Sequence, residues 1–170
     1  DIGVTGVQTC ALPIFFLPTG TIVTTKGRNY DENRVHQAEQ DGTWRMPLVV
    51  MIDGDSASAS EILAGALRDN RRATVVGERS YGKGSVQMIF ALNSCSAGMR
   101  LTTSKFFSPS GHAISDGGVE PDVAVGQQLV GTSAAPDRVA LLRPNLEADP
   151  SLATALRVAS RRLQIGRAHV

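Results

Sequence analysis

A strand–loop–helix–strand unit between Pro47 and Val76 constrains the fold of this 170-residue chain more than any other feature. The run LVVMID, residues 48–53, is apolar up to its final aspartate and is typical of a strand buried on both faces. After the loop GDSASAS, residues 61–70 carry apolar side chains on one helical stripe, which the asparagine at its end can terminate. A second apolar strand follows at 73–76, so we expect a right-handed crossover between parallel strands.

Outside this unit, most of the predicted elements are strands. Residues 86–92 and 99–107 are rich in β-forming residues and are joined by NSCSAG, which indicates a β-hairpin. Pro150 fits the first turn of a helix that runs to about residue 163. Further strands are expected at 21–26, 33–38 and 119–125. Together these elements predict an α/β fold with a partly parallel sheet, helices and a β-hairpin.

The composition excludes several classes of function. The chain has 17 basic and 16 acidic residues and a net charge of +1, which argues against a nucleic-acid partner and against a polybasic membrane patch. It contains no run of 18 apolar residues, the length that a membrane-spanning helix needs. The two cysteines, Cys10 and Cys95, make neither a disulfide framework nor a four-ligand zinc site. We therefore expect no nucleic acid, metal or cofactor.

The serine-rich loop before the helix has a structural and a catalytic interpretation. Ser58 and Glu61 fit a capping box, and a serine N-cap alone stabilises a helix by about 1 kcal/mol. Judged on these four residues alone, the cap is the favoured interpretation. However, a tight turn from a strand into a helix exposes a hydroxyl where α/β sheets place their sites. The positive end of the helix dipole there favours developing negative charge.

A nucleophilic serine needs a base, and three residues are candidates. His36 and His112 lie in polar segments, where a surface position is expected, and no GxSxG motif is present. Lys83 lies between Gly82 and Gly84, which let the backbone come close to another element. A lysine acts as a base only when neutral, which requires burial to lower its pKa. The alternative for Lys83 is an ordinary solvated lysine.

The same loop also resembles a P-loop. Gly77, Gly82 and Lys83 have the P-loop spacing after a strand. A P-loop needs serine or threonine directly after the lysine and then a helix, whereas Gly84 follows here and residues 85–92 alternate like a strand. A nucleotide-binding site is therefore disfavoured.

Three stretches of the chain resemble the carboxyl-terminal processing proteases, also called tail-specific proteases. They are FFLPTGTIV (15–23), the segment from Pro47 to Gln87, and LTTSKFFSPSGHAISDGGVEPDV (101–123). The resemblance implies a protease core of the ClpP and crotonase type. It also implies a serine endopeptidase that cleaves near the carboxyl termini of protein substrates, located in the periplasm or otherwise outside a bacterial cytoplasm.

The resemblance also implies roles for individual residues. Ser58 matches the nucleophile, Lys83 the general base and Gln87 a residue that assists this pair. The backbone N–H of Ala59 matches one half of the oxyanion hole. A non-catalytic binding or scaffold relative of the same fold is the alternative, and the presence of both Ser58 and Lys83 favours the enzyme.

Two acidic residues match supporting positions in some members of the family. Asp69 is one of them, and Glu61, which also fits the helix cap, is the other.

The two ends of the chain resemble translated sequencing-adapter arms. VTGVQTCALPI near the start and IGRAHV at the end occur in the expected order. We therefore interpret 1–14 and 165–170 as non-native and expect them to pack poorly, with the protease core at 15–126 and a linker and helix at 127–164. The family's Asn-Pro-Gly-Gly stretch and PDZ domain are expected upstream of this chain, so the fragment by itself is expected to be nearly inactive.

Overall fold

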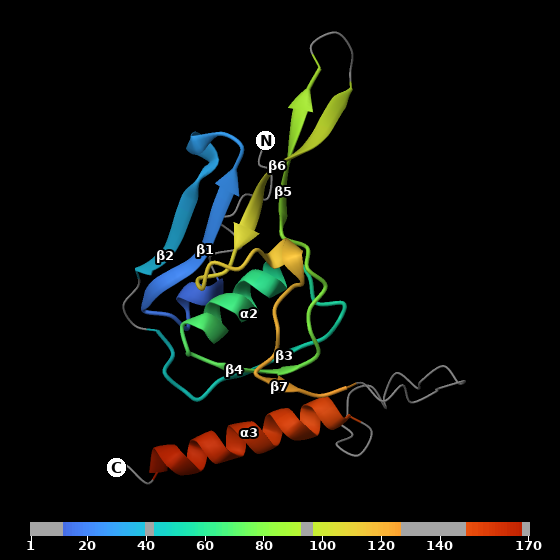
Figure 1. The fold of residues 1–170 in the computed structure, drawn as a ribbon. Coiled ribbons are helices and arrows are strands. Elements are labelled where there is room, and N and C mark those ends of the chain that lie inside the picture. Colours follow the sequence, from blue (N-terminus) through green and yellow to red (C-terminus); the bar gives the residue numbers. More distant parts are fainter. Residues whose placement is uncertain (1–11, 40–42, 93–96, 127–148, 168–170) are drawn as a thin grey trace, which may run out of the picture.

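The computed structural model describes residues 12–39, 43–92, 97–126 and 149–167, with the backbone alone for 164–167. Helix α2 (Ala59–Asp69) lies between two sheets (Figure 1). One sheet has four antiparallel strands in the order β2-β1-β6-β5, and the other has three parallel strands in the order β3-β4-β7. The strands are β1 (Thr19–Gly27), β2 (Arg34–Glu39), β3 (Val49–Ile52), β4 (Thr74–Gly77), β5 (Ser85–Ala91), β6 (Gly98–Phe107) and β7 (Val123–Ala124).

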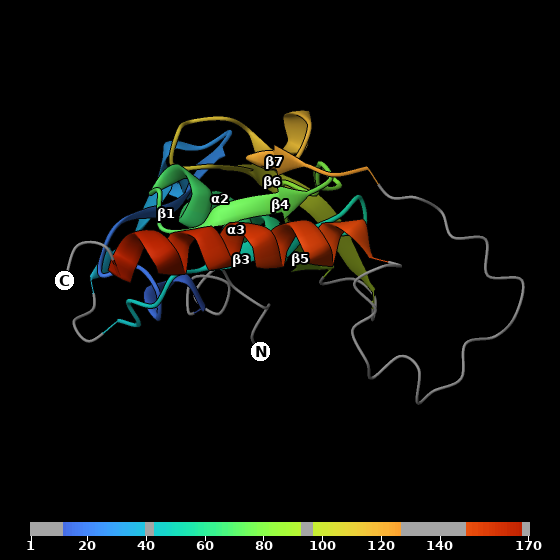
Figure 2. The same ribbon diagram turned by 90° about the horizontal axis from the view of Figure 1, so that it is seen from below.

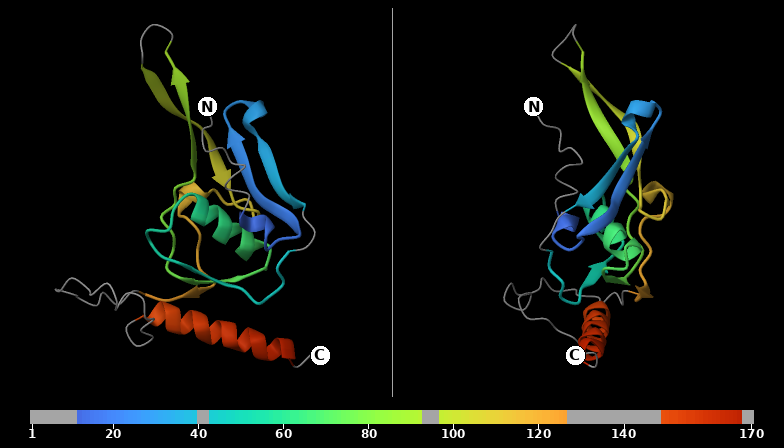
Figure 3. Two further views of the ribbon diagram at one scale, coloured as in Figure 1. Left: turned by 180° about the vertical axis from the view of Figure 1, so that it is seen from behind. Right: turned by 90° about the vertical axis from the view of Figure 1, so that its left-hand side faces the viewer.

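The crossover unit forms as predicted. β3 and β4 pair in parallel and α2 connects them, which confirms the α/β class. β5 and β6 form the predicted antiparallel hairpin, which projects away from the rest of the molecule (Figure 3). Two short 3-10 turns, η1 (Tyr30–Glu32) and η2 (Ile114–Asp116), complete the described elements.

Helix α2 is the centre of the hydrophobic core. On one side, Ile62 and Leu67 are almost fully buried together with Ile22 of β1. On the other side, Ala64 packs with Val75 of β4 in a second cluster. Because both sheets bury apolar side chains against this one helix, α2 fixes their relative position.

The helix α2 ends at the residue predicted from the sequence. Asn70 is the C-cap residue, and its side-chain amide donates to the carbonyl oxygens of Thr21 and Ala66, 2.8 Å each. Arg71 follows with a φ of 57°, and the N–H groups of Arg71 and Arg72 bond the carbonyls of Arg68 and Leu67. These two bonds make a Schellman motif, in which a left-handed residue is expected.

Helix α3 (Pro150–Arg167) crosses the three-stranded sheet on the side opposite α2 (Figure 2). It begins as predicted, with the Asp149 carboxylate accepting the Leu152 N–H at 2.8 Å, and it ends a turn later than predicted. The prediction that β3 is buried on both faces is wrong for Met51, which is 42% exposed. β3 is an edge strand, and α3 leaves this part of its outer face uncovered.

Strand β7 is shorter than the predicted 119–125. Pro121 has no N–H to donate, and the Val119 N–H bonds the Ser80 hydroxyl at 2.7 Å. Asp122 bonds β4 partly through its side chain, which accepts the Val75 N–H at 2.8 Å. Ladder pairing with β4 is therefore limited to Val123 and Ala124.

Of the described residues in 1–14, Pro13 and Ile14 contradict the predicted poor packing of the ends, whereas Leu12 is 54% exposed. Pro13 is fully buried and Ile14 packs against the core. The Pro13 carbonyl accepts the N–H groups of Phe16 and Leu17, so a helical turn directs these apolar side chains inward. Residues 1–11, 127–148 and 168–170, with Cys10 and much of the predicted linker, lie outside the described residues. Among the described residues, neither helix combines the length and the apolar character that crossing a bilayer requires.

We expect Leu67→Ala to lower the free energy of unfolding by about 2–5 kcal/mol, because the truncation leaves a cavity beneath α2 where Leu67 is 1% exposed. The matched control is Leu156→Ala on α3, where the leucine is 47% exposed and the loss should be below about 1 kcal/mol. Urea unfolding of the two variants measures the difference. Equal losses would contradict the assignment of α2 as the centre of the core.

Candidate active site

The loop between β3 and α2 is held by the Asp53 carboxylate. Its Oδ1 atom accepts the Ser56 hydroxyl at 2.7 Å, the Ser56 N–H at 2.8 Å and the Asp55 N–H at 3.2 Å. These hydrogen bonds, with the Ser56 hydroxyl as the largest cause, lower the pKa of Asp53 against the opposing effect of burial. The Ser56 hydroxyl is thus already hydrogen-bonded within the loop.

Ser58 adopts an unusual backbone conformation at the N-cap of α2. Its φ and ψ are 58° and −113°, whereas an N-cap residue is ordinarily extended. Among the described residues, only Ser58 and Arg71 combine a side chain with a positive φ. The helix end accounts for Arg71, but capping does not require the conformation of Ser58. Such a conformation costs on the order of 1–3 kcal/mol and is typical of functional sites.

The N-terminus of α2 offers a free donor beside Ser58. Ala59 is the first residue of the helix, and no hydrogen bond within the described part of the chain uses its N–H. Both Ser58 and Ala59 are exposed. An N–H at this end of a helix, beside an exposed hydroxyl, is suited to an oxyanion.

The lysine loop packs against a second segment through its glycines. A Cβ atom on Gly84 would overlap the backbone N of Ser115, and one on Gly82 would lie 3.2 Å from the backbone N of Gly118. The predicted close approach of another element is therefore confirmed, and that element is the segment around η2. Lys83 is held between these two contacts.

The Glu61 carboxylate joins the serine and lysine loops. Its Oε2 atom accepts the N–H of Ser58 and the N–H of Lys83, at 2.8 Å each. The two nitrogen atoms are therefore at most twice that distance apart. Its Oε1 atom accepts the N–H of Gly82 and the hydroxyl of Ser80, at 2.6 Å each. The predicted capping contact from Glu61 is present, but the carboxylate also fixes the position of the lysine backbone.

Glu61 is completely buried, and its charge is stabilised by donors. Within the described residues, no lysine, arginine or histidine forms an ion pair with it. Four hydrogen bonds and the positive end of the α2 dipole stabilise the carboxylate instead. Removing it would leave several buried donors without an acceptor.

Ser80 is a positioning residue that sequence reasoning missed. It is 6% exposed, and its hydroxyl donates to Glu61 while accepting the Val119 N–H at 2.7 Å. Its partners lie 19 and 39 residues away. A lone serine in a glycine-rich loop carries no signal that would have distinguished it.

The side chains of Ser58 and Lys83 both lie at the surface. Within the described residues, no hydrogen bond joins the Ser58 hydroxyl to the Lys83 ammonium group. The structure thus brings the two backbones together, and the pairing of the two side chains stays a prediction. Gln87 is exposed on β5, where Val86 pairs with Ser104 and Gln87 pairs with Thr102, so the ladder has a bulge at this point.

Asp69 lies away from this group. It is at the opposite end of α2 from Ser58, about 16 Å along the helix axis. Its Oδ2 atom accepts the Ser110 N–H at 3.0 Å and the Ser110 hydroxyl at 2.6 Å. Asp69 therefore anchors the segment that follows β6.

The alternatives from the sequence find little support in this geometry. His36 lies on β2, and burial, followed by repulsion from Arg34, lowers its pKa. No hydrogen bond of the described residues joins Ser58 to His36 or His112. The P-loop interpretation is wrong, because strand β5 and not a helix follows Lys83.

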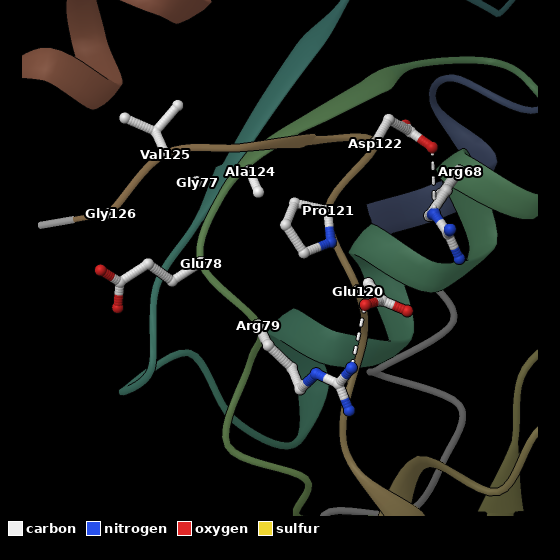
Figure 4. Close-up of a pocket in the computed structure, with 10 residues that line it drawn as sticks. All are labelled: Arg68, Gly77, Glu78, Arg79, Glu120, Pro121, Asp122, Ala124, Val125 and Gly126. Atoms are coloured by element: carbon white, nitrogen blue, oxygen red, sulfur yellow. Dashed lines mark hydrogen bonds and ion pairs between the residues drawn. The ribbon is translucent and has the colours of Figure 1, made fainter.

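A pocket of about 570 Å³ lies beside β4 and β7, and Figure 4 shows the residues that line it. Two ion pairs line it, Arg68 with Asp122 at 3.1 Å and Arg79 with Glu120 at 2.9 Å. Neither Ser58 nor Lys83 is among the residues that line this pocket.

Comparison with known proteins assigns the family. Residues 9–125 match the model of peptidase family S41, and the chain belongs to that family. Within it, the chain is 49% identical to a carboxy-terminal-processing protease of Bartonella bacilliformis over 67% of this chain and 26% of that protein. It is 44% identical to a carboxyl-terminal-processing protease of Synechocystis, over 68% of this chain and 26% of the relative. The family expected from the sequence is confirmed.

Solved structures agree with the fold. A photosystem II D1 C-terminal processing protease superposes with a TM-score of 0.61 and 31% identity, over 71% of this chain and 31% of that one. A lipoprotein from Streptococcus agalactiae, at 18% identity and a TM-score of 0.55 over 70% of this chain and 45% of that one, shares the fold. The chain spans about a quarter of the length of the curated relatives that it matches.

We expect Glu61→Gln to destabilise the fold by about 3 kcal/mol or more, because an amide has one acceptor oxygen and turns its NH₂ group toward other donors. The control is Glu120→Gln, where the carboxylate forms an exposed ion pair with Arg79 and the loss should be within about 1 kcal/mol. Urea unfolding measures both. Similar stabilities of the two variants would mean that Glu61 does not hold the loops together.

Proposed function

We propose that the protein containing this chain is a serine endopeptidase that cleaves protein substrates near their carboxyl termini. Ser58 is the nucleophile and Lys83 the general base. The observation that carries the proposal is the Glu61 carboxylate, whose Oε2 atom accepts the backbone N–H of both residues at 2.8 Å. The strained backbone of Ser58 at the N-terminus of α2 supports the same assignment.

In the proposed mechanism, the Ser58 hydroxyl attacks the scissile carbonyl while neutral Lys83 takes its proton. The negative charge that develops on the carbonyl oxygen is stabilised by the free N–H of Ala59 and by the end of the α2 dipole. The Lys83 ammonium then gives its proton to the leaving amine, and water hydrolyses the acyl-enzyme. Gln87, on the strand that follows the lysine, assists by orienting the lysine amine.

Lys83 must be neutral to accept a proton, and this requires the exclusion of water. Because the side chains of Ser58 and Lys83 are exposed here, we assign this desolvation to the bound substrate and to the rest of the polypeptide. In this proposal Glu61 and Ser80 position the two loops, and Asp69 supports the fold without touching the substrate.

We also propose a location outside the cytoplasm. The support is the family resemblance, together with relatives in Arabidopsis thaliana that are named carboxyl-terminal-processing peptidases and chloroplastic.

The test uses the full-length protein and a peptide with an unstructured carboxyl-terminal tail. Ser58→Ala and Lys83→Ala should each lower kcat/KM by roughly 10³-fold or more, since the two residues act as a unit. The control is Ser60→Ala, which removes a neighbouring exposed hydroxyl and should retain most of the activity. Cleavage is followed by mass spectrometry, and unfolding curves check that each variant is folded.

Two outcomes would overturn the proposal. Wild-type cleavage by Lys83→Ala would remove the lysine from the mechanism. Absence of any Ser58-dependent cleavage, with peptide binding retained, would favour the non-catalytic scaffold relative.

We expect the 170-residue chain by itself to cleave the same peptide at least roughly 10²–10³-fold more slowly than the full-length protein, because the proposed second oxyanion donor is upstream. Parallel assays of the two proteins at equal concentration measure the ratio. Equal rates would show that Ala59 and α2 are sufficient for stabilising the oxyanion.

A further inference from the structure

Strand β5 has a free edge that begins beside the lysine. Within the part of the chain that the structure describes, the four-stranded sheet ends with β5, so this strand has a single neighbour, β6. β5 starts at Ser85, two residues after Lys83, and runs outward along the projecting hairpin (Figures 1 and 3). The edge is therefore continuous with the candidate active site.

The register shows which backbone groups of β5 point outward. The hairpin closes with the Leu92 N–H bonded to the Ala97 carbonyl at 3.0 Å, and Phe90 pairs with Met99. In an antiparallel pair, successive residues alternate between bonding the partner strand and facing away from it. Leu92 and Phe90 therefore bond inward, whereas the N–H and C=O groups of Ile89 and Gln87 face the open edge.

The hairpin also leaves one apolar face uncovered. Cross-strand register places five large apolar side chains on the same face, and each is 42–50% exposed: Met88, Phe90, Leu92, Met99 and Leu101. Natural proteins usually protect such edges with charged residues or proline, and residues 85–91 contain neither. A two-stranded hairpin with an open edge and an apolar face is a template for one more strand.

We propose that the substrate adds to the outer edge of β5 as an extended strand, which leads it to Ser58 and Lys83. The inference rests on the proposed function and names how its substrate is held. The occupant is an unfolded polypeptide tail whose alternate side chains are apolar. Main-chain hydrogen bonds bind it without reading its sequence, and every second side chain packs beside the apolar face at Met88 and Phe90.

The continuity of this edge with the site favours a substrate over a second copy of the chain. Gln87 faces the open edge and also matches the residue that assists the dyad. A strand that bonds the backbone of Gln87 is therefore adjacent to the lysine loop. A second copy of the chain paired along β5 would block the path of a peptide to the lysine loop.

The test measures peptide binding to full-length protein that carries Ser58→Ala, so that it does not depend on cleavage. Fluorescence anisotropy follows labelled tail peptides with an N-methyl group at one residue at a time. Methylation removes one N–H, so we expect a period-two pattern in which alternate positions weaken binding about tenfold and the intervening positions have little effect.

Ile89→Pro in the same background removes an outward N–H at an edge position, where proline is tolerated. It should weaken binding about tenfold, because the peptide carbonyl that pairs with Ile89 loses its donor. Ile89→Ala keeps the N–H and should weaken binding less than about threefold. A circular dichroism spectrum checks that the hairpin is retained.

Binding without a period-two pattern, or binding that Ile89→Pro does not weaken, would overturn the strand-addition proposal. Conversion of a dimer to a monomer by Ile89→Pro with unchanged peptide binding would assign the edge to a second copy instead. Strand addition that is observed while wild-type protein cleaves nothing would refute the proposed function alone.

Discussion

The Glu61 carboxylate is the interaction on which the geometry of the candidate site depends. A buried carboxylate without an ion pair is stable only when donors surround it, and here the donors come from two different loops. The hydrogen bonds that stabilise the Glu61 carboxylate are therefore the same bonds that bring the serine and lysine loops together. The position of Glu61 in the first turn of α2 adds the helix dipole to this stabilisation, which links the site to the most buried helix of the core.

Most of the fold could be predicted from the sequence. The strand–loop–helix–strand unit and the hairpin were recognisable because periodicity and turn residues are local signals. The errors arose where a distant part of the chain decided the outcome. Met51 is exposed because β3 is an edge strand that α3 covers only in part. β7 is short because the Val119 N–H bonds the Ser80 hydroxyl and Pro121 has no N–H to donate.

The site was predictable to a different degree for each residue. Ser58 and Lys83 were assigned roles from the resemblance to a protease family, and the structure brings their backbones together. Glu61 was interpreted as a possible cap because a capping box is a four-residue pattern, whereas its bonds to the lysine loop span more than twenty residues. Ser80 was missed for the same reason, since both of its partners are distant in sequence.

A closed set of contacts explains how a strained serine persists in an exposed position. Glu61, in the first turn of α2, holds the lysine loop, and Asp69 at the other end of the helix holds Ser110. The segment after Ser110 packs against Gly84 of the lysine loop, so the contacts lead back to the loop that Glu61 holds. Strain at one residue is retained when the surrounding structure over-determines its position. The backbone of Ser58 is thus held by contacts that reach into the core, while the residue itself stays exposed.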